Sequence, residues 1–140
     1  MRRDGFTLTE VMFTVVILGI MATAVVLPQM QTLEAGKWRA SRDVLEAIYA
    51  GERVYQTLNK QYCTPNPKSP PPDCTWDEVY VDDPNAVKTI EGVTFTVEEI
   101  GGGAGFTATA TRDNGPCKNK ILTIDNAKTE TGDWPRNGKC

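Results

Sequence analysis

Residues 5–27 read GFTLTEVMFTVVILGIMATAVVL, an apolar run in which Glu10 is the one charged residue. The next charged residue along the chain is Glu34. A carboxylate near the centre of a lipid bilayer costs about 2.5–3.5 kcal/mol on insertion scales, and we expect a smaller cost near the end of an apolar segment. Because such runs normally exclude carboxylates, the presence of Glu10 predicts a positively charged partner for it.

The beginning of this run carries a family motif. The sequence GFTLTEV at residues 5–11 closely resembles the cleavage and methylation motif of type IV pilins and type II secretion pseudopilins. The resemblance implies that a prepilin peptidase cuts after Gly5 and that the new amine of Phe6 is N-methylated. It also implies that Glu10 neutralises the Phe6 amine of a neighbouring subunit in an assembled filament. The likeness covers residues 5–28, and its proline, Pro28, comes one residue later than usual.

The resemblance further implies a location and a set of partners. Before assembly the subunit would cross the inner membrane once, with its N-terminus in the cytoplasm, and afterwards it would belong to a cell-surface or periplasmic filament. Its partners would be copies of itself, related minor pilins, prepilin peptidase and the inner-membrane assembly machinery. We therefore expect a non-enzymatic subunit of a type IV pilus, without catalytic residues or cofactors. The alternatives are a pseudopilin of a type II secretion system and a minor pilin that binds DNA or another ligand.

Two other interpretations of the N-terminal segment stay open. In a conventional signal peptide, residues 22–24 would be a cleavage site of small residues. Asp4 and Glu10 are misplaced for such a peptide, and the helical pattern continues beyond the site. In a plain membrane anchor, residues 6–27 approach the ~20 residues that span hydrocarbon. That anchor would carry a binding module that never polymerises, and Glu10 would be incidental.

Composition limits the chemistry of the rest of the chain. The protein has 140 residues, a net charge of −3 and no histidine. This length corresponds to one small domain beside the N-terminal segment. Without histidine, His-dependent triads, His-ligated metal sites and His general bases are excluded. Four oxygen donors near the C-terminus follow no calcium-binding spacing, so we interpret them as solvated turn residues and expect no metal. They are Asp125, Asn126, Glu130 and Asp133.

Basic residues gather in the same region of the chain. Five of them surround Trp134 in the sequence, namely Lys118, Lys120, Lys128, Arg136 and Lys139. A basic patch with an aromatic residue is typical of single-stranded nucleic-acid binding. Acidic residues interspersed among them dilute the charge, so we do not expect a nucleic-acid partner.

All four cysteines follow the apolar run, and no pair has the short spacing of zinc or redox sites. An even number of cysteines beyond an export segment predicts two disulfides formed in an oxidising compartment. Three pairings are possible. We favour Cys63–Cys74 and Cys117–Cys140, because each is local and closes a stretch rich in proline or glycine. Each such loop contributes roughly 3 kcal/mol on the chain-entropy estimate.

Periodicity predicts the fold class. Apolar residues recur at intervals of three and four beyond Pro28, which predicts a helix from Phe6 to near Asn59. Charged residues on this helix, Glu52 among them, are expected on its exposed surface. Around residue 93 the period changes to two, which predicts three short strands in an antiparallel meander. The glycines at 101–103 are expected to form a hairpin turn. The expected class is α+β, a long helix packed on a small antiparallel sheet.

The predicted organisation follows from these elements. Residues 1–5 are expected to be a leader peptide, and residues 6–30 a hydrophobic transmembrane and assembly helix. Residues 31–140 would form a periplasmic or extracellular globular head. We expect this head to contain the continuation of the helix, a proline-rich loop at 61–78, an antiparallel sheet at 93–125 and a C-terminal loop.

Overall fold

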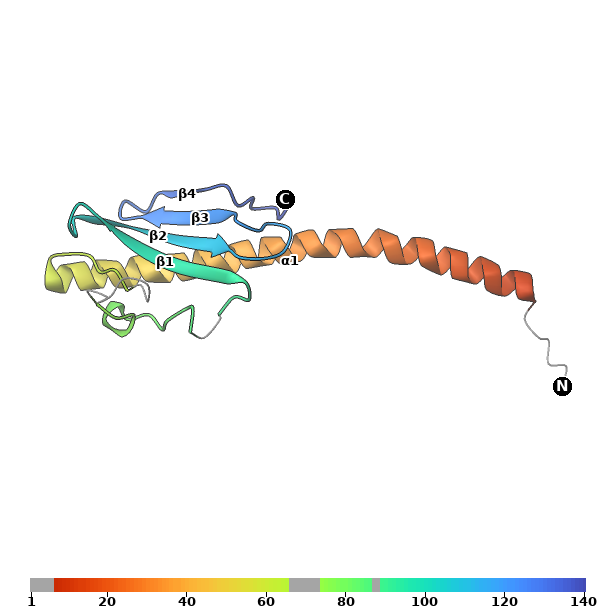
Figure 1. Cartoon of the computed structure of the whole chain (residues 1–140), viewed down its shortest axis with the longest axis horizontal. Helices are drawn as coiled ribbons and strands as arrows, with labels where there is room; N and C mark the ends of the chain where they lie inside the picture. The colour runs from red at the N-terminus through yellow and green to blue at the C-terminus, as the bar shows by residue number, and fades with distance from the viewer. Residues whose placement is uncertain (1–6, 66–73, 87–88) are drawn as a thin grey trace.

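A computed structural model describes the backbone of residues 7–65, 74–86 and 89–140, and the side chains of these residues except 23–28. One long helix, α1, dominates the molecule (Figure 1). Its C-terminal half lies under a four-stranded sheet, and its N-terminal half projects beyond this head (Figure 1). The expected α+β class, with a long helix packed on a small antiparallel sheet, is confirmed.

Helix α1 spans Leu8–Asn59. It begins after Thr7, which has an extended backbone and whose side chain accepts a hydrogen bond from the Glu10 N–H, an N-cap that satisfies one unpaired donor of the first turn. It ends at Lys60, which adopts a left-handed conformation and donates its N–H to the Gln56 carbonyl at 2.8 Å. The predicted C-terminal end is therefore confirmed.

The sheet consists of β1 (Val93–Ile100), β2 (Gly105–Arg112), β3 (Ile121–Asp125) and β4 (Glu130–Gly132). The strands follow one another in the order β1-β2-β3-β4, and all neighbours are antiparallel. The predicted meander is thus correct, but β4 lies in the stretch expected to be a C-terminal loop. It has three residues and no apolar alternation, so its sequence carries no strand signal. Pairing with β3 places it in the sheet.

The core forms between one face of the sheet and α1. On β1 the inward residues are Phe95 and Val97, and on β2 Phe106 and Ala108 occupy the same face. Leu45 and Ile48 of α1 belong to the same buried cluster. The alternation of period two in the strands and the apolar stripe of the helix therefore meet as the sequence predicts.

The turn between β1 and β2 agrees with expectation, whereas the loop after α1 and the position of Glu52 differ from it. The glycine turn between β1 and β2 is confirmed: Gly101, Gly102 and Gly103 all have positive φ, which glycine adopts without steric cost. At the end of the loop predicted at 61–78, a short 3-10 helix, η1 (Asp77–Val79), packs against α1. Residues 66–73 of this loop lie outside the described residues. Glu52, expected on the surface of the helix, is instead fully buried, because η1 and the segment after α1 cover that face.

Candidate assembly segment and its attachment to the head

The N-terminal part of α1 exposes nearly all of its apolar surface. Large apolar side chains between residues 8 and 21 are 49–80 % exposed. They are Leu8, Val11, Met12, Phe13, Val15, Val16, Ile17, Leu18, Ile20 and Met21. This part of the helix projects beyond the head, so the head of its own chain does not cover these side chains (Figure 1). A continuous apolar surface of this kind marks a site of contact with other molecules. We call residues 8–22 the assembly segment.

Glu10 lies in the first turn of the assembly segment. Thr7 accepts the Glu10 N–H at 3.4 Å, and Thr14 donates to the carbonyls of Glu10 at 3.1 Å and Val11 at 2.8 Å. These bonds use backbone groups of Glu10 and leave its carboxylate to other partners. Within the described part of the chain, no ion pair involves that carboxylate. Its position at a helix N-terminus is itself favourable for a negative charge.

The other predicted processing residues lie outside the described residues. Gly5 and Phe6 belong to this group, so cleavage after Gly5, methylation of Phe6 and the pairing of its amine with Glu10 stay predictions. The segment at 6–30 was expected to cross a membrane. Among the described residues, no helix has a stretch both long and apolar enough to do so.

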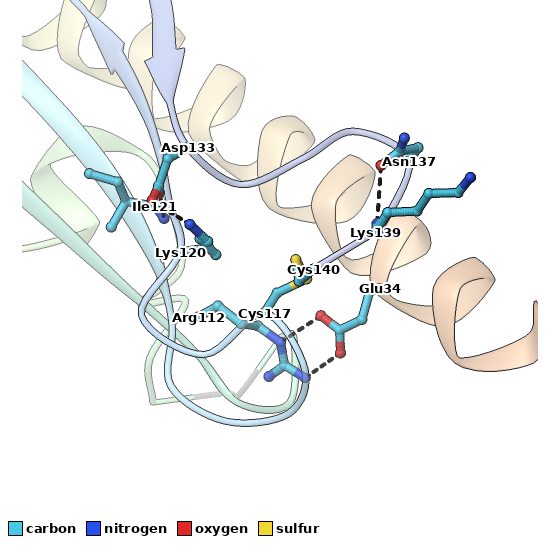
Figure 2. Close-up of a disulfide and its surroundings, with 9 residues drawn as sticks. All are labelled: Glu34, Arg112, Cys117, Lys120, Ile121, Asp133, Asn137, Lys139 and Cys140. Carbon is cyan, nitrogen blue, oxygen red and sulfur yellow. Dashed lines mark hydrogen bonds and ion pairs between the residues drawn. A yellow bond between two sulfur atoms is a disulfide. The ribbon is translucent and has the colours of Figure 1, made fainter. Parts of the chain in front are cut away.

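A buried ion pair joins α1 to the sheet at a point C-terminal to the assembly segment. Arg112, at the end of β2, donates from Nε and Nη2 to the two carboxylate oxygens of Glu34 on α1, at 3.0 and 2.8 Å (Figure 2). Both side chains are almost fully buried, with 2 % of the Arg112 side chain and 6 % of the Glu34 side chain exposed. The hydrogen bonds from Arg112 lower the pKa of Glu34 below its ordinary value, against the opposing effect of burial.

Loop carbonyls complete the surroundings of the guanidinium. Nη1 of Arg112 donates to the carbonyl of Gly92 and to Oδ1 of Asn114, each at 2.6 Å. The buried charge is therefore paired on one side and hydrogen-bonded on the other, the condition under which a buried ion pair is tolerated. This pair was not predicted. One signal for it existed, because Arg112 has the same parity along β2 as the buried Phe106 and Ala108.

The C-terminus is fastened at the same place. A disulfide joins Cys117 to Cys140 close to the Glu34–Arg112 pair (Figure 2), and a second joins Cys63 to Cys74. These are the two pairings favoured from the sequence. Gly138 has a φ of +68° and lies so close to the Gln31 carbonyl of α1 that a Cβ there would clash with it. The C-terminal tail therefore packs directly on the helix, where the head begins.

Comparison with known proteins bears on the N-terminal end of this arrangement. Residues 1–26 match the family model described as the prokaryotic N-terminal methylation motif. The chain carries a prokaryotic N-terminal methylation motif. That motif is characteristic of type IV pilins and pseudopilins. Neither the curated proteins nor the solved structures gave a match to the chain. The matched residues include Glu10 and the whole assembly segment.

Three of the five basic residues near Trp134 in the sequence interact with other parts of the head. Trp134 is buried in the core, so its ring is not available to stack on a base. Lys120 pairs with Asp133 at 2.9 Å, and the guanidinium of Arg136 lies 5.3 Å from the ring centre of Trp38. Lys128 lies over the ring of Tyr49. These cations interact with their own head.

The oxygen donors considered for calcium are also engaged within the chain. Asp125 accepts the N–H groups of Ala127 and Thr129, and Glu130 pairs with Arg42 at 2.6 Å. Over residues 7–65, 74–86 and 89–140, no group of three or more His, Cys, Asp or Glu side chains is placed to hold a metal ion. The carboxylates of the tail act in turns and in contacts between elements.

Proposed function

We propose that this protein is a structural subunit of a type IV pilus filament that polymerises through the N-terminal half of α1. One observation carries the proposal. The methylation motif at residues 1–26 leads directly into a helical segment whose apolar side chains are exposed and project beyond the head. A soluble monomer rarely leaves so large an apolar surface uncovered. Packing of this segment among identical helices of neighbouring subunits would cover it.

In this proposal the subunit is processed before it assembles. Prepilin peptidase cuts after Gly5, and the amine of Phe6 is methylated. The precursor waits in the inner membrane with its N-terminus in the cytoplasm, and the filament grows to the cell surface. Lipid and the helix bundle are both apolar, so transfer from one to the other supplies little specificity. Specificity then comes from side-chain packing and from pairing of Glu10 with the Phe6 amine of a neighbour, a contact between charges that must be matched in an apolar surrounding.

Mass spectrometry of the mature protein, purified from its native membrane or filaments, tests the processing step. The expected mass corresponds to loss of residues 1–5 and gain of one methyl group on Phe6. A protein cut after Ala24, or an uncut protein, would contradict the proposal and favour the signal peptide or the plain anchor. A matched control is the variant Gly5→Leu, in which the residue before the cut is bulky and the leader should be retained.

A pseudopilin of a type II secretion system is the second candidate, because the motif is shared by both classes. The disulfide Cys117–Cys140 favours a pilus, since a C-terminal disulfide resembles many pilins and is uncommon in major pseudopilins. Electron microscopy of filaments sheared from cells, with identification of the subunit, separates the two. Surface filaments built from this chain support the pilus, and a secretion defect on deletion without such filaments supports the pseudopilus.

A further inference from the structure

A second buried carboxyl group lies far from the assembly segment. Glu52 of α1 is 0 % exposed. Its Oε2 accepts the backbone N–H of Cys63 at 3.0 Å. Cys63 belongs to a small apolar cluster with Cys74 and Val79 that is separate from the main core. The carboxyl group therefore links the helix to the chain that leaves it, directly after Tyr62, which packs on Phe106 in the main core.

η1 packs closely against α1 beside Glu52. Gly51, the neighbour of Glu52, has no room for a Cβ, because one would clash with the carbonyl oxygen of Val79. The turn around η1 is closed by hydrogen bonds from the N–H groups of Val79 and Val81 to the Trp76 carbonyl. Helix and turn thus touch through backbone atoms, and the side chain of Glu52 is enclosed beside this contact.

Among the described residues, no counter-charge is paired with the carboxyl group of Glu52. Its Oε1 atom is buried and makes no hydrogen bond within the described part of the chain. Burial raises the pKa of Glu52 to about 7, and the hydrogen bond from Cys63 opposes this effect. The titratable and charged side chains on the elements around it are Arg53, Tyr55, Lys60, Tyr62, Asp77 and Glu78.

None of those described side chains contributes to the pKa of Glu52. Arg53 donates to the Tyr62 hydroxyl at 3.4 Å, and Glu78 accepts the Thr75 N–H at 2.7 Å. Lys68 and Asp73 lie outside the described residues. A negative charge on Glu52 would therefore be desolvated and, among the described side chains, unpaired, which costs much more than burial of the neutral acid.

We propose that Glu52 is a pH-dependent latch that holds the segment Cys63–Pro65 on α1 as the neutral acid and favours release of this segment when it loses its proton. The anion gains solvation if the segment moves away and admits water, and the neutral acid gains little from the same motion. The disulfide Cys63–Cys74 stays intact in both states, so the opening is local and reversible.

The direction of the effect follows from proton linkage. The closed state holds the Glu52 proton up to a pKa of about 7, and in the open state the group returns towards its ordinary value of 4.5. Opening therefore releases a proton between these two values. Its equilibrium constant rises roughly tenfold for each pH unit between pH 5 and pH 7 and is constant above that range.

Hydrogen exchange of the Cys63 amide in the full-length chain tests the latch. Exchange rates are corrected for the intrinsic pH dependence of an unprotected amide, and the protection factor is plotted from pH 5 to pH 8.5. For the wild type we expect a fall of roughly tenfold per unit up to pH 7 and a plateau beyond. For Glu52→Gln, which keeps the shape and an oxygen acceptor without the titrating proton, we expect a flat profile.

A matched control removes a different carboxylate from the head. Glu98 on β1 is exposed, and Glu98→Gln should reproduce the wild-type slope. A flat wild-type profile between pH 5 and pH 7, or a wild-type slope in Glu52→Gln, would overturn the proposal. If Glu52→Gln does not fold, titration of the wild-type Glu52 carboxyl carbon by NMR decides. A midpoint near 7 supports the latch, and a midpoint below 5 overturns it.

Discussion

At the scale of single residues, three glutamates of α1 occupy three different environments. Glu34 is buried with Arg112, whereas neither the exposed Glu10 nor the buried Glu52 has an ion-pair partner among the described residues. The same chemical group is therefore suited to pairing between chains, to pairing within the chain and to release of a proton. The surroundings of each side chain, more than its sequence position, decide which of these it does.

The role of Glu10 is tested by filament yield. Glu10→Val removes the carboxylate but keeps the assembly segment apolar, so export and cleavage after Gly5 should continue while surface filaments fall to a small fraction of the wild-type amount. Thr14→Val is the matched control, because it removes a neutral polar group one turn further along the same segment. Immunoblotting of sheared filaments and of the membrane pool measures both quantities. Wild-type filament yield from Glu10→Val would refute the proposed pairing.

The Glu34–Arg112 pair is tested by chemical unfolding of the full-length chain in detergent. Arg112→Ala leaves the Glu34 carboxylate buried without its partner, which should lower the free energy of unfolding by about 3–5 kcal/mol at pH 7. The comparison is Arg42→Ala, whose ion pairs with Glu46 and Glu130 are partly exposed and screened by solvent, so that their loss should lower the free energy of unfolding far less. Equal losses in the two variants would show that burial does not set the strength of these pairs.

At the scale of elements, the contact between α1 and η1 depends on the absence of a side chain. Gly51 and Gly36 are both interior glycines of α1, but a Cβ at Gly51 would clash with the Val79 carbonyl, whereas a Cβ at Gly36 would meet nothing within 4 Å. Intrinsic helix propensity alone would make alanine better than glycine at both positions. The two sites therefore separate propensity from packing within one helix.

Substitution of each glycine by alanine gives results of opposite sign. Gly36→Ala should stabilise the protein by about 0.4–1 kcal/mol through lower entropy of the unfolded chain. Gly51→Ala should destabilise it by about 1–3 kcal/mol, because η1 must move away from the helix. Midpoints of urea unfolding measure both changes. A stabilising Gly51→Ala would mean that η1 adjusts without cost and that the close contact is not needed.

One disulfide, Cys117–Cys140, attaches the C-terminal tail to the rest of the head. Replacement of Cys117 and Cys140 together by serine should lower the free energy of unfolding by roughly 3 kcal/mol, the value that chain entropy gives for a loop of this length. Reduction of the wild type followed by blocking of its thiols is a check without substitution, although it opens Cys63–Cys74 as well. Unchanged stability of the double variant would show that contacts such as that of Gly138 with α1 hold the tail unaided.

At the scale of the whole molecule, the two buried glutamates make stability depend on pH in opposite directions. Glu34 has a lowered pKa, so its contribution is complete above the ordinary value of 4.5 and is lost as pH falls below it. Glu52 has a pKa raised to about 7, so stability falls by about 3 kcal/mol as pH rises from 4.5 to 7. Together they predict maximum stability close to pH 5.

Unfolding free energies measured from pH 3 to pH 9 test this profile. Glu52→Gln should remove most of the fall between pH 5 and pH 7, and Glu34→Gln should remove much of the fall below pH 4.5 at the cost of lower stability near neutral pH. The side chain of Glu98 is exposed, so Glu98→Gln should change neither the fall in stability below pH 4.5 nor the fall between pH 5 and pH 7. A wild-type stability that rises steadily from pH 5 to pH 8 would contradict the environment assigned to Glu52.

The sequence by itself determined the methylation motif, the long helix, three of the four strands and the α+β class. Each of these depends on residues that lie close together in the sequence. The signal is either a fixed motif or apolar residues that recur with a period of 3.6 or of two residues. Only the tertiary structure decided that β4 joins the sheet, that Glu34 meets Arg112 and that Glu52 is enclosed. These features need partners far away in the chain, as with Glu34 and Arg112, or a segment that folds back over the helix. A charged residue on an amphipathic helix looks the same in sequence whether water or a distant loop covers it, because burial is a property of the assembled fold.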